Sequence, residues 1–223
     1  MALLMLGLGL GVYWKAPTKA STLFFMSNFC FSLAFLTPPY FESFLWRNVV
    51  AANFVLFITL GLAFFLHLTV VFPKPKPLMA EGGFWELIIY VPAPLLAINY
   101  LGLRLFQPRA DLLVNLVLHN VFALLVGACL VLALAAVVHS YFKATSPVKD
   151  QVLMPVLLGS FIGAIPPAVG FVLGILTPQV ILPGHDYYPL LSVLVTLSFG
   201  WAMWKTNAAP EEYEGLHHAA HAA

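Results

Sequence analysis

The sequence predicts an all-α fold, namely a polytopic transmembrane helix bundle with six to seven spans. Hydrophobic residues make up 61% of the 223 residues, charged residues make up only 9%, and the mean hydropathy is +0.94. In a soluble domain about a quarter of all residues are charged, and they cover its surface. Most of this chain is therefore expected to face lipid or other helices.

A helix needs roughly 20 residues to cross a hydrocarbon layer about 30 Å thick, and six apolar stretches reach or nearly reach this length. They lie at residues 20–37, 48–72, 84–103, 112–142, 152–177 and 187–204. A seventh stretch, residues 1–14, would reach only about 21 Å as a helix. It lacks the basic leader and small-residue cleavage site of a secretory signal, so we expect a short span there. No linker interrupts the spans, which predicts one transmembrane domain over 1–204 and a polar tail over 205–223.

The loops between the spans predict the orientation, because short loops rich in lysine and arginine stay on the cytoplasmic side. Lysines fall on alternate loops that one membrane face would share, whereas arginines fall on the opposite face. The lysines are Lys15, Lys19, Lys74, Lys76, Lys143, Lys149 and Lys205, and the arginines are Arg47, Arg104 and Arg109. Seven lysines against three arginines predict that the lysine face and the C-terminus are cytoplasmic.

Charge and motifs argue against several classes of function. The net charge of +1 and the absence of a basic or acidic block give no reason to expect nucleic acid as a partner. The chain has no glycine-rich phosphate loop, no nucleophile elbow and no HExxH, so we expect no enzyme and no catalytic residues. Cys30 and Cys129 lie in apolar runs, where they are expected to pack as small residues rather than to bind a metal.

Ionisable residues inside a span are costly and are therefore hypotheses for a functional site. His67 lies about four residues before the lysine-rich end of its span, and His139 lies at a similar distance before Lys143. Two histidines at one depth are suited to binding haem or a chlorophyll-type pigment, or to proton transfer. Hydrogen bonds to a neighbouring helix carbonyl or to interfacial water are the alternative, and it is the one that we favour. The sequence leaves this choice, and the cofactor, open.

Other polar residues sit near the span ends. His119 and Asn120 lie near the outer end of the stretch 112–142. There they are suited to bind a polar ligand or to join helices by hydrogen bonds. Glu86 lies in the first turn of its span, where a carboxylate also complements the helix N-terminus. We expect an interfacial role for Glu86, with proton transfer as the alternative.

Prolines and glycines predict where the helices kink and pack. Pro92 and Pro94 interrupt one span, and Pro166 and Pro167 interrupt another, and each proline frees a backbone carbonyl. These breaks predict a cavity near the bilayer centre, as in transporters with broken helices. Small residues at four-residue spacing predict close helix packing at Gly159, Gly163, Gly170 and Gly174.

Three phrases resemble a known family. They are "FFLHLTVVFPKPKPL", "VKDQVLMPVLLGSFIGAIPPAVGFVLGIL" and "YYPLLSVLVTLSFGWAMWK". Together they are similar to the polytopic N-terminal membrane region of bacterial sensor histidine kinases and related signalling proteins, over about residues 48–204. His67 and Pro73 match the family phrase that closes one span. The kinase module that follows in the family has no counterpart after Trp204, so the resemblance implies a sensor or accessory module without kinase activity, in the inner (cytoplasmic) membrane of a bacterium.

Three functions remain open on the sequence. The first is a non-catalytic membrane module for signal sensing or for accessory assembly with protein partners in the bilayer. The second is a haem- or (bacterio)chlorophyll-binding subunit of an electron-transfer or photosynthetic complex, with His67 or His139 as ligand. The third is a small transporter with its site at the kinked spans that contain Pro92 and Pro166.

Overall fold

The computed structural model describes residues 1–36, 43–74, 76, 83–106, 112–144, 148–176 and 188–208. Within these residues the chain is helical and contains no strand, which confirms the all-α prediction for the described part. The helices are α1 (Ala2–Lys15), α2 (Lys19–Leu36), α3 (Phe44–Val71), α5 (Phe84–Tyr90), α6 (Pro92–Phe106), α7 (Leu112–Lys143), the π-helical turn η1 (Lys149–Leu153), α9 (Met154–Leu176) and α10 (Tyr188–Ala208).

Four described helices are long and apolar enough to cross a membrane by length and composition. They are Lys19–Leu36, Phe44–Val71, Phe84–Leu103 and Asn120–Lys143. Two shorter apolar helices cover Ala2–Lys15 and Leu190–Thr206. Hydropathy therefore located the apolar helices, and their composition fits a membrane protein, but only four of the described helices meet the length and composition of a span, so the number of six to seven stays a prediction. Helix α10 continues to Ala208, four residues into the predicted tail, and residues 209–223 lie outside the described part.

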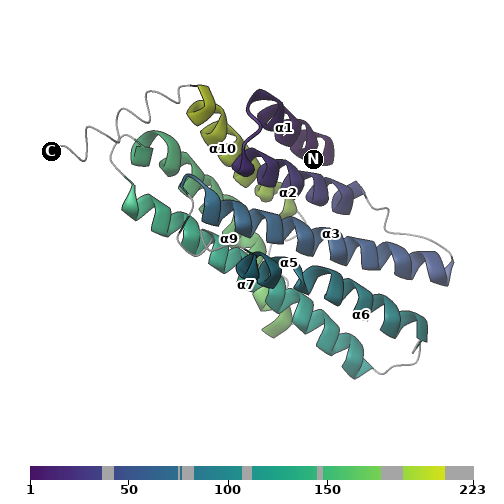
Figure 1. Cartoon of the computed structure of the whole chain (residues 1–223). Helices are drawn as coiled ribbons and strands as arrows, with labels where there is room; N and C mark the ends of the chain where they lie inside the picture. Colours follow the sequence, from purple (N-terminus) through teal and green to yellow (C-terminus); the bar gives the residue numbers. More distant parts are fainter. Residues whose placement is uncertain are drawn as a thin grey trace.

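Helix α3 lies at the centre of the bundle and packs on α2, α5, α6 and α7 (Figure 1). On one side of it α1 and α2 form an antiparallel pair that also reaches α10, and on the other side α6 and α7 lie along its length. The pair formed by α9 and α10 closes the bundle against α7 and α1. A core of buried apolar side chains joins α2, α3, η1, α9 and α10, and Leu68, Val152, Val156 and Phe199 are almost fully inaccessible there.

The outer surfaces of the helices are apolar. Trp14 is 83% exposed, Phe142 is 73% exposed and Ile98 is 67% exposed, and many other large apolar side chains also point outward. Water disfavours such a surface, whereas hydrocarbon chains do not. The outside of the bundle is thus suited to contact with lipid.

Contacts between side chains bring the lysine-bearing helix ends together. The ammonium of Lys15 lies 3.8 Å from the ring centre of Trp204, and Lys205 donates to the Gln151 side chain at 2.8 Å. Lys19 pairs with Glu86 at 3.0 Å. The C-terminal ends of α3, α7 and α10 lie on this side of the molecule, at the left of Figure 1. The lysines predicted to share one face are therefore gathered at one end of the bundle, which we call the lysine end.

The chain turns back after α3 and leaves the carbonyl of Thr69 without its helical donor. Pro73 has no N–H, so the carbonyl of Thr69 loses its usual helical donor. The ammonium of Lys76 donates to Thr69 O at 2.8 Å and to Ala136 O of α7 at 3.1 Å. Burial lowers the pKa of Lys76 below its ordinary value of 10.5, because it disfavours the charged ammonium. The two carbonyls act in the opposite direction, since they accept hydrogen bonds from the ammonium. Lys76 thus fastens the end of α3 to α7.

The two proline pairs have different effects. Helix α5 ends at Tyr90 and α6 begins at Pro92, with Val91 as a turn between them. Pro92 and Pro94 remove two helical donors here, which accounts for the break. Helix α9 instead continues through Pro166 and Pro167 to Leu176 without interruption in its assignment. Val91 nevertheless keeps helical backbone angles (φ −60°, ψ −37°) and donates to Leu87 O at 2.9 Å, so the predicted interruption amounts to a local loss of helical hydrogen bonds there, and none is seen in α9.

Candidate functional site

A polar cluster joins three helices near the lysine end. His67 comes from α3, Glu86 and Tyr90 come from consecutive turns of α5, and Lys19 begins α2. Nδ1 of His67 lies 2.8 Å from the Tyr90 hydroxyl, and Nε2 lies 3.7 Å from Oε1 of Glu86. The same carboxylate oxygen accepts from the ammonium of Lys19 at 3.0 Å. We call these four residues the latch, because they are the polar contacts that hold α5 on α3 and α2.

The neighbours of the histidine determine which ring nitrogen carries the proton. The carboxylate of Glu86 is paired with Lys19 and can only accept, so it favours an N–H on Nε2 of His67. Nδ1 is then an acceptor, and the Tyr90 hydroxyl donates to it. At 3.7 Å the Nε2 contact is electrostatic rather than a hydrogen bond, and Nε2 has no hydrogen-bond partner among the described residues.

Exposure rises along the latch. The His67 side chain is 3% exposed, that of Glu86 is 39% exposed and that of Lys19 is 57% exposed. An ion pair as exposed as Glu86 and Lys19 contributes less than about 1 kcal/mol. The buried contact between His67 and Tyr90 is therefore the stronger part of the latch.

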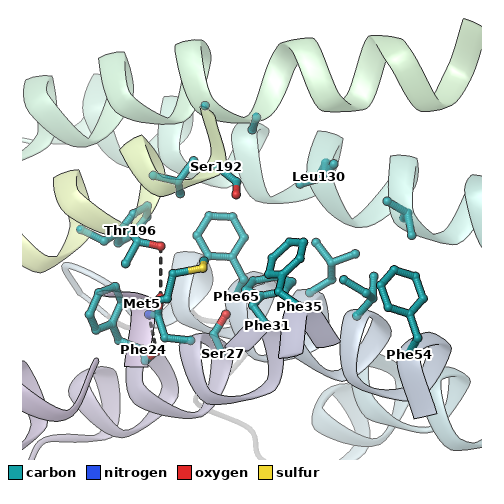
Figure 2. Close-up of a pocket in the computed structure, with 18 of the residues that line it drawn as sticks. Met5, Phe24, Ser27, Phe31, Phe35, Phe54, Phe65, Leu130, Ser192 and Thr196 are labelled. Atoms are coloured by element: carbon teal, nitrogen blue, oxygen red, sulfur yellow. Dashed lines mark hydrogen bonds between the residues drawn. The ribbon is translucent and has the colours of Figure 1, made fainter. Parts of the chain in front are cut away.

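An elongated apolar cavity of about 220 Å³ lies inside the bundle (Figure 2). Side chains from α1, α2, α3, α7, α9 and α10 line it, and seven of them are phenylalanines. The lining residues are Met5, Phe24, Ser27, Asn28, Phe31, Phe35, Phe54, Ile58, Leu62, Phe65, Phe122, Val126, Leu130, Gly163, Ala164, Ser192, Val195, Thr196 and Phe199. An apolar space of this kind suits an apolar ligand, since a cavity of about 150 Å³ is enough to bind benzene.

Polar groups gather on one part of this wall. Thr196 donates from α10 to Oδ1 of Asn28 on α2 at 3.1 Å, and Asn28 donates to the carbonyl of Phe24 at 2.8 Å. Ser27 donates to the carbonyl of Gly61 on α3 at 2.9 Å. In Figure 2 Thr196 lies toward one end of the cavity and Phe54 lies at the other end. These polar side chains are buried and bonded within the protein, so the surface that the cavity presents is apolar along its whole length.

The other histidines named from the sequence are placed differently. His139 is exposed on α7, whereas His67 is buried on α3, so the two rings lie in different surroundings. Asn120 is half-buried on α7, and the side chain of His119 lies outside the described part. Neither His67, His139 nor Asn120 lines the apolar cavity.

The prolines lie away from the apolar cavity. Pro92 lines a separate open groove of about 340 Å³ between α6 and α7, together with Asn99. Pro94 is exposed and Pro166 is half-buried, and the side chain of Pro167 lies outside the described part. Neither Pro92, Pro94 nor Pro166 lines the apolar cavity, which approaches Pro166 only at Ala164.

The glycines of α9 let α10 come close. A Cβ at Gly159 would lie 2.9 Å from the carbonyl oxygen of Leu194, and one at Gly163 would lie 2.7 Å from that of Leu191. Both distances are too short for a side chain, so this contact requires glycine. Gly170 is half-buried, and Gly174 falls among the α9 residues of which only the backbone is described.

Sequence reasoning identified His67 and Glu86 but missed Tyr90 and Lys19. The signal for Tyr90 was present, since it lies four residues after Glu86 and so on the same face of α5. Nothing in the sequence indicates which helix this face contacts. No group of three or more His, Cys, Asp or Glu side chains in the described ranges is arranged to hold a metal ion.

Comparisons with known proteins add no relative to this geometry. No protein-family model matches the chain, and no curated protein or solved structure matches it.

Proposed function

We propose that the protein is a non-catalytic, multi-pass membrane module that senses a signal or supports the assembly of a larger membrane complex. In this topology the chain crosses the inner membrane of a bacterium six to seven times, with the lysine end and the C-terminus in the cytoplasm. Its surroundings are lipid and protein partners in the bilayer. The apolar helix surfaces and the gathering of lysines at one end support this arrangement.

One observation carries the proposal, namely that α3 presents the apolar cavity on one face and the latch on the opposite face. Phe54, Ile58, Leu62 and Phe65 recur at three- and four-residue spacing and line the cavity. His67 lies about 180° around the helix from the centre of that row. A change in the cavity that shifts or rotates α3 therefore changes the latch directly.

The latch in turn controls a segment that is able to move. Helix α5 has seven residues and no buried residue, and it joins α6 through Val91, with two prolines in the first turn of α6. Besides the latch, the ring of Phe64 contacts the ring of Tyr90 at 5.0 Å between centres. A short, poorly buried helix next to a break is drawn from the least stable part of a fold. We infer that release of the latch lets α5 swing at Val91 and alters the surface of the lysine end.

Distances between spin labels test this mechanism in the full chain. The native cysteines are replaced (Cys30→Ala, Cys129→Ala), and labels are placed on α5 at Leu87, which is 60% exposed, and on α2 at Met26. The labelled protein is measured by pulsed electron paramagnetic resonance in phosphatidylcholine nanodiscs. We expect Tyr90→Phe to broaden the distance distribution or add a second population, because the bond to His67 is lost.

A second label pair provides the control. Leu158 on α9 and Leu197 on α10 are both outward-facing and far from the latch in the sequence, and their distance is expected to stay the same in the Tyr90→Phe variant. An unchanged distribution for the α5 and α2 labels would show that packing alone holds α5, which would remove the proposed mechanism. A change in both pairs would indicate general loosening and also count against it.

A second candidate function has one observation in its favour. Nε2 of His67 is buried and has no hydrogen-bond partner in the described part of the chain. In the other tautomer, with the proton on Nδ1 and donated to the Tyr90 hydroxyl, the lone pair of Nε2 would be suited to bind the iron of haem or the magnesium of a chlorophyll-type pigment. The absorption spectrum of the protein purified from its native membrane tests this. A Soret or Qy band that disappears in His67→Phe would favour the pigment-binding function over the sensing function.

A further inference from the structure

We propose that a row of lysines and aromatic rings across the lysine end binds an anionic phospholipid. Four lysines make up this row, which we call the basic row: Lys15 in the last turn of α1, Lys143 in the last turn of α7, Lys149 in η1 and Lys205 in the last turn of α10. The inference goes beyond the proposed function and does not rest on it, because it uses neither the apolar cavity nor the latch. It requires only that the bundle lies in a membrane.

One half of the basic row joins α1, α10 and η1. The ammonium of Lys15 lies 3.8 Å from the ring centre of Trp204, and α1 and α10 pack on each other. The next residue of α10, Lys205, donates to the side chain of Gln151 in η1 at 2.8 Å. Two ammonium groups thus flank one tryptophan at the end of the bundle.

The other half of the row joins η1 to α7. The ammonium of Lys149 lies 4.7 Å from the ring centre of Tyr141 and 5.9 Å from that of Phe142. Lys143 follows Phe142 directly and is exposed. The row therefore runs from α1 across α10 and η1 to the end of α7.

The described carboxylates do not neutralise this row. The described part of the chain holds two acidic side chains, Glu86 and Asp150. Glu86 pairs with Lys19 of the latch, and Asp150 is exposed and forms no ion pair with another described residue. Four ammonium groups thus face one free carboxylate. Phosphate oxygens accept strong, charge-assisted hydrogen bonds from lysine, so the row favours a phosphate over a neutral head group.

Helix ends alone do not explain the row. A lysine in the last turn of a helix also complements the negative end of the helix dipole, and this applies to α1, α7 and α10. Lys149 instead lies in η1, directly before α9, where the dipole disfavours a cation. A phosphate shared with the neighbouring lysines would stabilise Lys149 at this position.

An exposed apolar face below the row selects a lipid over a soluble anion. Leu190, Leu194, Leu197, Trp201 and Trp204 recur on α10 at three- and four-residue spacing and are 53%, 37%, 43%, 55% and 49% exposed. Such spacing places them on one face of the helix. The face is about 21 Å long, which exceeds the roughly 15 Å of one leaflet. A phospholipid with its phosphate at the row therefore lays its acyl chains along this face.

Native mass spectrometry of the full-length protein tests the inference. Phosphatidylglycerol and phosphatidylcholine with the same acyl chains are titrated separately into the protein in detergent micelles, and the dissociation constant of the first bound lipid is measured. We expect phosphatidylglycerol to bind at least fivefold more tightly, because its head group is an anion whereas that of phosphatidylcholine is neutral overall.

Variants locate the site. Lys15→Met is expected to weaken phosphatidylglycerol about fivefold, the contribution of one lysine at an anionic lipid surface, and to leave phosphatidylcholine unchanged. Lys15→Arg keeps the charge and should restore the affinity to within twofold. If Lys15→Met does not fold, Lys143→Met at an exposed position serves the same purpose. Arg47→Met is the matched control, because Arg47 is exposed, lies 5.9 Å from the ring centre of Phe44 and belongs to the opposite end of α3.

Two other occupants are distinguished by the same measurement. Glycerol 1-phosphate carries the phosphate without the chains and is expected not to displace the lipid. Displacement at a concentration equal to that of the lipid would mean a site for soluble phosphates. Glu211, Glu212 and Glu214 lie outside the described residues, and their joint replacement by glutamine is expected to leave the affinity unchanged. A fivefold rise would mean that the tail of the chain covers the row, and would overturn the inference.

Two further outcomes would overturn it. Equal affinity for the two lipids would remove the recognition of the head group. An equal loss in Arg47→Met and Lys15→Met would mean attraction to the overall charge and not to the basic row. Neither result affects the spin-label test, which is made in phosphatidylcholine and concerns the distance between α5 and α2.

Discussion

The contact between His67 and Tyr90 leads to the sharpest prediction, a double-mutant cycle with Tyr90→Phe and His67→Phe. Tyr90→Phe keeps the aromatic ring and removes the hydroxyl that lies 2.8 Å from Nδ1. It leaves a buried nitrogen without a partner, and this is expected to lower the free energy of unfolding by about 1–3 kcal/mol. His67→Phe removes both nitrogens, after which the Tyr90 hydroxyl has lost its partner.

The cycle isolates the interaction itself. Hydrogen bonds between membrane helices average about 0.6 kcal/mol and reach about 1.7 kcal/mol in such cycles. Because the His67 side chain is only 3% exposed, we expect a coupling free energy in the upper half of that interval. The purified full chain is unfolded by sodium dodecyl sulfate in mixed micelles and followed by circular dichroism.

Tyr13→Phe is the matched control, since Tyr13 is 37% exposed on α1 and outside the latch. Its effect is expected to stay within about 0.5 kcal/mol. A coupling below about 0.3 kcal/mol, which is the error of additivity between independent sites, would refute the reasoning. The 2.8 Å contact would then be a consequence of packing and not a force that holds α5.

Three further predictions concern packing, the end of α3 and orientation. Gly159→Leu should destabilise the protein by about 1–3 kcal/mol or more, because a side chain there meets the backbone of α10. Gly102→Ala is the control and should be neutral or stabilising, because an added Cβ at Gly102 meets nothing within 4 Å. Denaturant titration compares the two variants, and equal effects would contradict the close contact between α9 and α10. Lys76→Met should lower the free energy of unfolding by about 2 kcal/mol, because two carbonyls lose a charged donor. Lys74→Met at an exposed position is the control and should have little effect on the free energy of unfolding. Equal effects of the two variants would argue against Lys76 as the residue that holds the end of α3 on α7. Green fluorescent protein fused to the C-terminus should fluoresce in bacterial cells and a fused alkaline phosphatase should be inactive, and the opposite pattern would reverse the proposed orientation.

The helices could be predicted from the sequence because hydropathy is a local property that a window of about 20 residues measures directly. The predicted stretch 48–72 corresponds to α3 at Phe44–Val71, and 112–142 corresponds to α7 at Leu112–Lys143. The helix ends differ by up to four residues, since capping and turns decide them. The break at Val91 was also predictable, because proline lacks a donor wherever it stands in a helix.

The site could be predicted only in part. His67 and Glu86 were selected as costly polar residues in apolar surroundings, which is again a local criterion. That they meet depends on how α5 lies on α3, and the sequence does not encode this in any one segment. His139 satisfied the same criterion and yet is exposed on α7. Local cost thus selects candidates, and only the packing of helices decides which of them meet.

The apolar cavity was not predicted, since the cavity expected from the sequence was placed at the prolines and none of the described prolines lines this one. Its wall is drawn from six helices between Met5 and Phe199, and each lining phenylalanine alone is indistinguishable from an ordinary core residue. A cavity is a difference between the space that the helices enclose and the volume that their side chains fill. That difference is set by close contacts elsewhere, such as Gly61 against the ring of Phe31, where an added Cβ would lie 2.8 Å from the ring.

This contact also explains why the cavity and the latch belong together. Gly61 holds α2 close to α3, and Ser27 of α2 donates to the carbonyl of the same glycine. Lys19, at the start of α2, then reaches Glu86 of the latch. In the proposed mechanism a ligand that pushed on Phe31 would act on α2 and α3 at once, and each of these helices carries one side of the latch. The proposed coupling thus runs through two helices that share a cavity wall and a polar contact, and the spin-label distances test whether these helices have two arrangements.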